Sequence, residues 1–286
     1  MKLINSSVIV KEQESGIDGV YKQIEWAGRH CYKSLDKITE DSAKEFVDRM
    51  IKLGHGAILE HGTVYLAIPM TTYAPDAVNK YRGNAYSKVN DCNEFIFTDK
   101  YGDKVAAWCV TTNLRVLVEN DCLEDLEFLC EPTEHHEKRI TAKFICDRAT
   151  ANQFVRHRVF SFAQESQRYC NYSKDKFNKE ILFIKPTWYK DDASIVKSNE
   201  RTFCEILQKC ETYYFYLLED GAKPQEARGV LPNATKTELV MTGFESDWEG
   251  FFKLRCSGAA HPDAKKLADE LKSLMNVKNI ELNSVK

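Results

Sequence analysis

One short segment of the chain, residues 156–169 (RHRVFSFAQESQRY), carries side chains that could bind and orient an anionic ligand. Three basic residues come first, and a hydroxyl and a guanidinium follow after a spacer of seven residues: Arg156, His157, Arg158, Ser166 and Arg168. A guanidinium is planar and donates paired hydrogen bonds to phosphate oxygens. Three interpretations follow: contact with a nucleic acid, a site for a phosphate-bearing small molecule, or a solvated basic end of a helix.

The surroundings of these cations are apolar, because Phe154, Val155, Val159, Phe160 and Phe162 are interleaved with them. A charge in such a place costs free energy unless it has a partner, which argues against a purely solvated surface. The net charge of the 286-residue chain is −3, whereas proteins that coat nucleic acids usually carry a basic excess. We therefore favour a local anion site, and we regard contact with a nucleic acid as the weaker interpretation.

The elements that position these residues are predicted from apolar spacing and β-branched runs. A strand at 140–145 leads into a helix at 147–158, which carries the three basic residues at its carboxyl end. Further helices are predicted at 17–34, 42–53, 114–130, 202–221 and 246–255, and further strands at 61–68, 93–98, 105–112 and 235–243. Capping boxes are expected at 42–45 (SAKE) and 246–249 (SDWE). This order lacks a regular βαβ alternation and predicts an α+β fold.

We expect one domain over residues 1–286, since a chain of this length can bury a substantial core. Residues 70–137 are predicted to form an inserted β-rich subdomain, because the segment has apolar content of its own. The helix at 202–221 is predicted to bury or dock a continuous apolar stripe: Phe203, Ile206, Leu207, Cys210, Tyr213, Tyr214 and Leu217.

Ten cysteines are present without a C-x-x-C pair, so reduced thiols and no metal site are expected. The start of the chain, MKLINSSVIVKEQES, lacks the pattern of a signal peptide, and no apolar run has the length of a membrane span. We therefore predict a cytoplasmic protein without a membrane partner. His135 and His136 are adjacent and point apart on any regular element, so both are interpreted as surface or loop residues.

Four segments, in order, resemble the motifs of the flavin-dependent thymidylate synthases. The Arg-His-Arg group, the spacer of seven residues and the Ser-x-Arg-Tyr that ends at Tyr169 are similar to the family signature. The others are GHGAILEH (54–61), QEARGVLP (225–232) and MTGFESDWEGFFKLR (241–255). The resemblance implies the α+β fold of that family and a methyltransferase that converts dUMP to dTMP. It also implies FAD as cofactor, NADPH and 5,10-methylenetetrahydrofolate as co-substrates, and a homotetramer that holds FAD between subunits.

The resemblance also implies roles for individual residues. Arg255 stands where the family places a cation at the N3/O4 edge of uracil, so it is a candidate catalytic residue together with Ser166. A hydroxyl without an evident general base is a poor nucleophile, and we interpret Ser166 as a polar ligand contact. Cys170 is interpreted as structural. The expected dUMP contacts are Gln153, Arg156, Gln164, Glu165, Ser166, Gln167, Arg168, Arg228 and Arg255. The expected FAD contacts are His55, Arg156, His157, Arg158 and Gln164.

The sequence departs from the family pattern at several positions. Gln164 stands where a glutamate is usual and Ala163 where an asparagine is usual, which puts the contact with ribose and flavin in doubt. Ala57 replaces a hydroxyl residue, and Phe244, Ser246 and Gly250 replace polar residues near the adenine end of FAD. Two alternatives stay open: a nucleic-acid-binding protein that uses residues 156–169, and an inactive relative that binds flavin or nucleotide.

Overall fold

The computed structural model describes residues 1–70, 75–98, 102, 104–168, 170–190 and 198–284, and Tyr169 lies outside them. Its fold is α+β, as predicted. The helices are α1 (Gly16–Tyr32), α2 (Ser42–Lys52), α3 (Gly56–Leu59), α4 (Pro75–Arg82), α5 (Leu114–Glu119), α6 (Arg148–Phe154), α7 (Ser198–Glu219), α8 (Pro224–Ala227), α9 (Glu245–Arg255) and α10 (Pro262–Ser284). The strands are β1 (Lys2–Ile4), β2 (Ser7–Lys11), β3 (Thr63–Pro69), β4 (Lys88–Thr98), β5 (Lys104–Asn113), β6 (Arg139–Asp147), β7 (Ser161–Gln164), β8 (Leu182–Ile184) and β9 (Lys236–Phe244).

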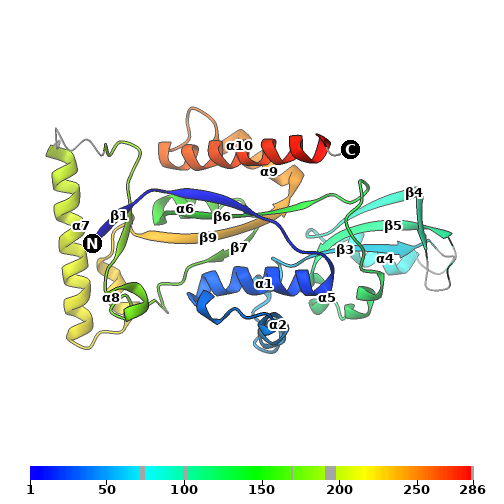
Figure 1. The fold of residues 1–286 in the computed structure, drawn as a ribbon, viewed down its shortest axis with the longest axis horizontal. Coiled ribbons are helices and arrows are strands. Elements are labelled where there is room, and N and C mark those ends of the chain that lie inside the picture. The colour runs from blue at the N-terminus through cyan, green and yellow to red at the C-terminus, as the bar shows by residue number, and fades with distance from the viewer. Residues whose placement is uncertain (71–74, 99–101, 103, 169, 191–197, 285–286) are drawn as a thin grey trace.

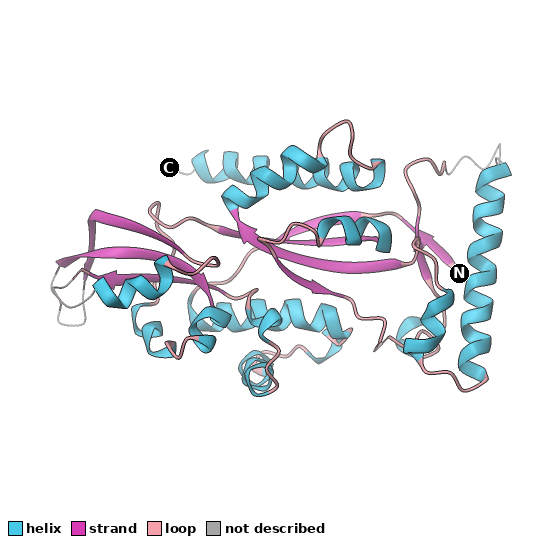
Figure 2. Ribbon diagram, turned by 180° about the vertical axis from the view of Figure 1, so that it is seen from behind, coloured by secondary structure: helices cyan, strands magenta, loops and turns pink. Residues whose placement is uncertain are grey.

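A four-stranded antiparallel sheet in the order β2-β6-β9-β7 forms the centre of the molecule. Helices α6, α9 and α10 cover one face, and α1 and α2 lie on the other; this layering is visible from both sides (Figures 1 and 2). Strand β9 is buried along its whole length. Its Leu239 and Met241 pack in one core with Trp248 and Phe251 of α9, whereas Val240 packs in a second core.

The second core contains residues of α1, α2 and the three-stranded sheet β3-β5-β4. Val110 and Leu114 pack there with Val20 and Ile24 of α1. Strands β4 and β5 lie within residues 70–137, but their sheet includes β3, which precedes residue 70. The inserted β-rich subdomain, and with it the division into a domain and an insertion, therefore stays a prediction.

A third, smaller core joins α7, α8 and the short parallel pair β1-β8 at one end of the central sheet (Figure 1). Leu207 and Tyr214 of α7 are buried, but Ile206 and Tyr213 are 51% and 58% exposed. The predicted apolar stripe is thus only partly covered. Gly221, which follows the helix, has φ +94°, a left-handed conformation that suits glycine.

Several helix boundaries predicted from the sequence are wrong. The helix expected at 114–130 is divided into α5 and a 3₁₀ turn at Leu123–Phe128, with Asp121 at φ +51° between them. Neither capping box forms where it was predicted, because α2 begins at Ser42 itself and α9 begins at Glu245. The Ser42 hydroxyl donates to Glu25 Oε2 at 2.9 Å instead of capping. Helix α10 was not predicted.

No helix within the described residues is long and apolar enough to cross a bilayer.

Candidate functional site

The three consecutive basic residues lie in a turn directly after α6, not in the helix. Asp147 begins α6 by accepting hydrogen bonds from the Thr150 amide at 2.8 Å and hydroxyl at 2.6 Å. The helix ends at Phe154, four residues earlier than predicted, and the amide of His157 donates to the Phe154 carbonyl at 3.1 Å. Arg156 and Arg158 are exposed on this turn, with half-buried His157 between them. The cations therefore spread around the end of α6, as an anion site requires.

Arg255, at the end of α9, joins this turn from the neighbouring helix. Its Nε donates to His157 Nε2 at 3.0 Å, and Nη1 donates to Gln153 Oε1 at 3.2 Å. Nη2 donates to the Gln153 carbonyl at 2.5 Å. Among the described residues the guanidinium has no carboxylate partner. Burial lowers its pKa, and the charge of Arg156 lowers it further. The structure thus brings three predicted residues, Gln153, His157 and Arg255, into direct contact.

His157 is held as a neutral imidazole. Burial lowers its pKa to about 4, and the charge of Arg255 acts in the same direction. Because Nε2 accepts the hydrogen bond from Arg255, the ring proton is on Nδ1. The ring packs against Phe251 with centroids 5.0 Å apart. At neutral pH this side chain therefore offers one N–H donor, while the positive charge of the turn comes from its arginines.

The segment after β7 runs between two elements. The Glu165 amide donates to the Glu238 carbonyl of β9 at 2.8 Å, and the Ser166 amide donates to the Cys31 carbonyl of α1 at 3.1 Å. Gln164 and Ser166 are half-buried, whereas Glu165 and Gln167 are buried. No described side chain forms a hydrogen bond with the Ser166 hydroxyl. The structure therefore offers Ser166 no general base.

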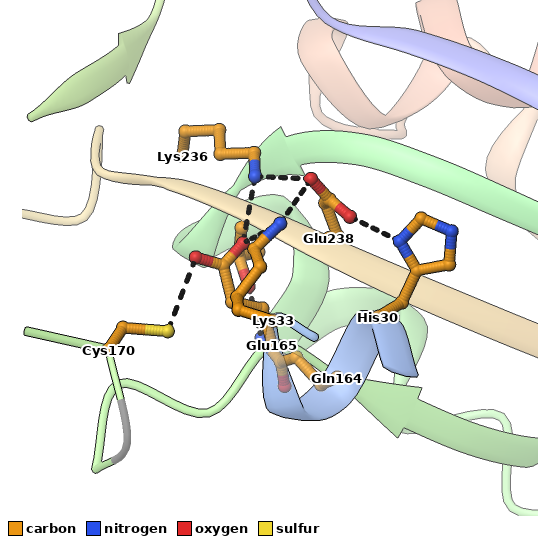
Figure 3. Close-up of polar contacts among 8 residues, drawn as sticks. His30, Lys33, Gln164, Glu165, Cys170, Lys236 and Glu238 are labelled. Carbon is orange, nitrogen blue, oxygen red and sulfur yellow. Dashed lines mark hydrogen bonds and ion pairs between the residues drawn. The ribbon is translucent and has the colours of Figure 1, made fainter. Parts of the chain in front are cut away.

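A group of five side chains, which we call the buried charge cluster, lies behind this segment (Figure 3). It consists of His30 and Lys33 from α1 and the residue after it, Glu165, and Lys236 and Glu238 from β9. Lys236 Nζ contacts Glu165 Oε2 at 2.8 Å and Glu238 Oε1 at 2.5 Å. Lys33 Nζ bridges the same two carboxylates, at 3.2 Å from Glu165 Oε2. His30 Nδ1 donates to Glu238 Oε2 at 2.5 Å.

Charges in this cluster stabilise one another. Burial alone would lower the pKa of Lys236, but Glu165 and Glu238 outweigh burial and raise it. Burial alone would raise the pKa of Glu238, but His30, Lys236 and Lys33 together lower it. Burial lowers the pKa of His30 despite its bond to Glu238. The cluster therefore holds two carboxylates, two ammonium groups and a neutral histidine, which is a balanced set.

Sequence reasoning missed four members of this cluster: His30, Lys33, Lys236 and Glu238. A signal was present, because Lys236 and Glu238 are two residues apart and so share one face of the strand predicted at 235–243. Two inward-facing charges on a fully buried strand need partners. The prediction that Glu165 contacts dUMP stays a prediction, and in this structure the carboxylate, 3% exposed, faces the lysines.

Arg168 and Arg228 flank the third core. Arg228 begins a 3₁₀ turn, Arg228–Val230, directly after α8. The neighbouring Ala227 packs in the same core as Cys170, two residues after Arg168. Cys170 is 1% exposed, and its thiol lies 3.8 Å from Glu165 Oε1. Each arginine is therefore within two residues, along the chain, of a member of the third core.

His55 lies apart from these residues. It precedes α3 and is exposed, and its Nδ1 is 2.8 Å from the Tyr32 hydroxyl at the end of α1. The two rings stack at 6.2 Å between centroids and 29° between planes. Both line a cavity of about 400 Å³ between α1 and α2. This side of the central sheet is opposite to α6 and α9 (Figure 1), so one chain does not bring His55 to Arg255.

Two further observations bear on the remaining predictions. His136 lies in a loop, as one of the two predicted alternatives, but it is buried because Thr133 and the Leu66 carbonyl bind its ring nitrogens. A second cavity, of about 350 Å³, lies between β2, the start of α1 and β6, and none of the predicted site residues lines it.

Comparison with known proteins identifies the family. Residues 130–278, just over half of the chain, match the thymidylate synthase complementing protein family, and the chain belongs to it. The chain is 34% identical over 128 residues to the flavin-dependent thymidylate synthase of Geobacter sulfurreducens, covering 45% of this chain and 52% of that protein. Proteins of the same name from Mycobacterium tuberculosis and Pyrococcus furiosus are 32% and 30% identical, over 43% of this chain and 51% and 48% of theirs.

The chain spans about half the length of these relatives in each alignment. The family match contains the basic turn, Arg228 and Arg255, whereas His55 precedes it. The role expected for His55 therefore rests on the short GHGAILEH motif alone.

Proposed function

We propose that this protein is a flavin-dependent thymidylate synthase, which transfers a one-carbon unit from methylenetetrahydrofolate to dUMP and reduces it to the methyl group of dTMP. The observation that carries the proposal is the contact of Arg255 with both Gln153 and His157. Arg255 is about one hundred residues from the other two in the sequence, and the family resemblance assigns all three to one nucleotide and flavin site.

Arg255 suits the activation of a uracil ring. The ring must become electron-rich before its carbon attacks the one-carbon unit, and negative charge then develops at its N3/O4 edge. A fixed cation in a partly desolvated place stabilises such charge. Gln153 and His157 hold the guanidinium in one orientation, so little reorganisation is needed as the charge develops. We propose Arg255 as the catalytic residue and Ser166 as a contact to the nucleotide.

The phosphate of dUMP is proposed to bind Arg168 and Arg228, each of which is within two residues, along the chain, of a member of the third core. A guanidinium is suited to a phosphate because both can form paired hydrogen bonds. The remaining proposed dUMP contacts are Gln153, Arg156, Gln164, Glu165 and Gln167, of which Glu165 faces the lysines of the buried charge cluster in this structure.

FAD is proposed to bind Arg156, His157, Arg158, Gln164 and His55. The donors of the turn after α6 fit the group, because reduced flavin is anionic and neither Arg156 nor Arg158 has a carboxylate partner among the described residues. When bound, the flavin supplies hydride chemistry, with NADPH as reductant. The protein then supplies binding, orientation and charge. Gln164, whose Nε2 lies 3.4 Å from Thr237 Oγ1, is proposed to bind as a neutral amide.

A product assay tests this proposal. Purified protein with dUMP, methylenetetrahydrofolate, FAD and NADPH is expected to form dTMP. Omission of dUMP, methylenetetrahydrofolate or NADPH, or removal of bound FAD, is expected to stop product formation. Chromatographic separation of dUMP and dTMP provides the measurement. If the folded protein retains FAD but forms no dTMP, the protein is an inactive relative that binds flavin without catalysing the reaction. A protein that retains no FAD and binds RNA or DNA in a steeply salt-dependent way would support the nucleic-acid interpretation.

A further inference from the structure

We propose that Glu165 and Lys236 are positioning residues, which hold residues 164–168 in place for dUMP through the buried charge cluster. The inference rests on the proposed function and goes beyond it, because it gives Glu165 a role other than contact with the substrate. Four of the residues expected to contact dUMP, besides Glu165, lie in this short segment: Gln164, Ser166, Gln167 and Arg168.

The backbone of the segment is fixed from both sides at neighbouring residues. Glu165 donates its amide proton to β9 at 2.8 Å, and Ser166 donates its amide proton to the end of α1 at 3.1 Å. The charge cluster links the same three elements, since its side chains come from the end of α1, from β9 and from Glu165 (Figure 3). Backbone and side chains thus form one clamp.

The orientation of Glu165 determines the orientation of its neighbours. In extended backbone, successive side chains point to opposite sides. Glu165 is turned to the two lysines, whereas Gln164 places its Nε2 3.4 Å from Thr237 Oγ1. Both Gln164 and Ser166 are more exposed than Glu165. The loss of the Glu165 anchor would therefore rotate or loosen the two residues that are proposed to touch the nucleotide.

The clamp depends on charge balance. Lys143 of β6 faces the cluster too, and Glu238 acts to raise its pKa although burial lowers it. Removal of one member leaves an uncompensated charge in a buried place, which is more costly than removal of a matched pair. Glu165→Gln leaves an excess of positive charge, and Lys236→Met leaves an excess of negative charge. The double variant Glu165→Gln/Lys236→Met retains Glu238 with Lys33 and restores the net charge of the wild-type cluster.

Steady-state kinetics of these three variants test the proposal. Each single variant is expected to lower kcat/KM for dUMP by roughly 100-fold, the effect of a small misplacement of binding groups. The double variant is expected to have a kcat/KM for dUMP at least tenfold higher than that of either single variant. The matched control is Lys80→Met. Lys80 Nζ lies 2.5 Å from Asp125 Oδ2, so this substitution removes another partly buried ion pair in a different part of the fold. The kinetics of this variant should equal those of wild type. Single variants that unfold at lower temperature but keep wild-type kinetics and dUMP affinity would overturn the proposal.

Hydrogen exchange of the protein without ligands gives a readout that does not depend on activity. The Glu165 and Ser166 amides are expected to lose protection in both single variants, to regain it in the double variant and to keep it in Lys80→Met. If wild-type protein makes no dTMP but exchange follows this pattern, the proposed function fails and the clamp stands. If wild-type protein is active but neither single variant changes the exchange or the kinetics, the clamp fails and the proposed function stands.

Discussion

Arg255 is the side chain on which the proposed chemistry depends most. It is separated by about one hundred residues from Gln153 and His157, yet donates to both. Its charge is not neutralised by a carboxylate among the described residues, so it remains available for an anion. Arg168, by contrast, is exposed and suits the binding of a phosphate that does not change during the reaction.

This difference predicts distinct kinetic effects of two substitutions. Arg255→Ala should lower kcat by roughly 100- to 1,000-fold, because it removes a group that stabilises charge in the transition state. Arg168→Ala should mainly weaken dUMP binding, by roughly 10- to 100-fold, because it removes charged hydrogen bonds made before the reaction. Steady-state kinetics and dUMP titration measure both. If both variants behave as wild type, the site assignment is wrong.

The neutral state of His157 predicts an unusual titration. Its pKa of about 4 means that the folded protein takes up this proton only near pH 4, whereas the unfolded chain takes it up near pH 6.5. The unfolded state therefore binds more protons between these values, and stability from His157 falls as pH falls through that window and is complete above it. NMR of labelled histidine should show the low midpoint in wild type and a higher midpoint in Arg255→Ala. A wild-type midpoint at or above 6.5 would contradict the geometry.

At the residue scale, the structure brings together three residues that the sequence motifs single out, Gln153, His157 and Arg255, and the roles expected for them stay predictions. The buried charge cluster was not foreseen, because Lys33 and Glu238 look like ordinary surface charges until the burial of β9 is known. Pairing between residues 33, 165 and 238 depends on tertiary packing, which local patterns do not contain.

At the scale of elements, the predicted strands at 140–145 and 235–243 correspond to β6 and β9, since long β-branched and apolar runs determine a buried strand. Helix ends were predicted less well. The 114–130 segment carries apolar residues along its whole length, but the polar run at 119–121 interrupts it. Asp121 adopts a left-handed conformation that divides the predicted helix. Helix α6 ends early, where Phe154 becomes part of the core with Phe144.

Two glycines of the β9–α9 region provide a matched test of this packing. A Cβ atom at Gly243 would lie 2.4 Å from the ring of buried Phe160, next to the basic turn, whereas a Cβ at Gly250 would meet nothing within 4 Å. Gly243→Ala should therefore lower the free energy of unfolding by roughly 1–3 kcal/mol. Gly250→Ala, within α9, should raise it by about 0.5–1 kcal/mol. Denaturant unfolding measures both, and an equal effect of the two would contradict the packing of β9 against Phe160.

At the scale of the whole molecule, the proposed site is distributed over both faces of the central sheet. His55 lies with α1 and α2, and Arg255 lies with α6 and α9 (Figure 1). If one reaction needs both residues, different subunits must supply them. This agrees with the homotetramer expected from the family, which stays a proposal.

Subunit complementation tests the distribution. His55→Ala and Arg255→Ala are each expected to be nearly inactive, but co-expression with different affinity tags should give mixed oligomers with activity well above either variant alone. Some sites in such oligomers combine an intact His55 from one subunit with an intact Arg255 from another. If the doubly tagged oligomer is no more active than the His55→Ala or Arg255→Ala protein alone, a site shared between subunits is contradicted.

The central claim, a flavin site coupled to nucleotide binding, is tested most directly by an absorbance spectrum. The protein is incubated with FAD, desalted and then reduced anaerobically by NADPH, with and without dUMP. We predict that flavin bands remain after desalting and bleach with NADPH, faster when dUMP is present. A colourless protein after desalting, or bleaching that ignores dUMP, would contradict the account of Arg156, His157, Arg158 and Arg255.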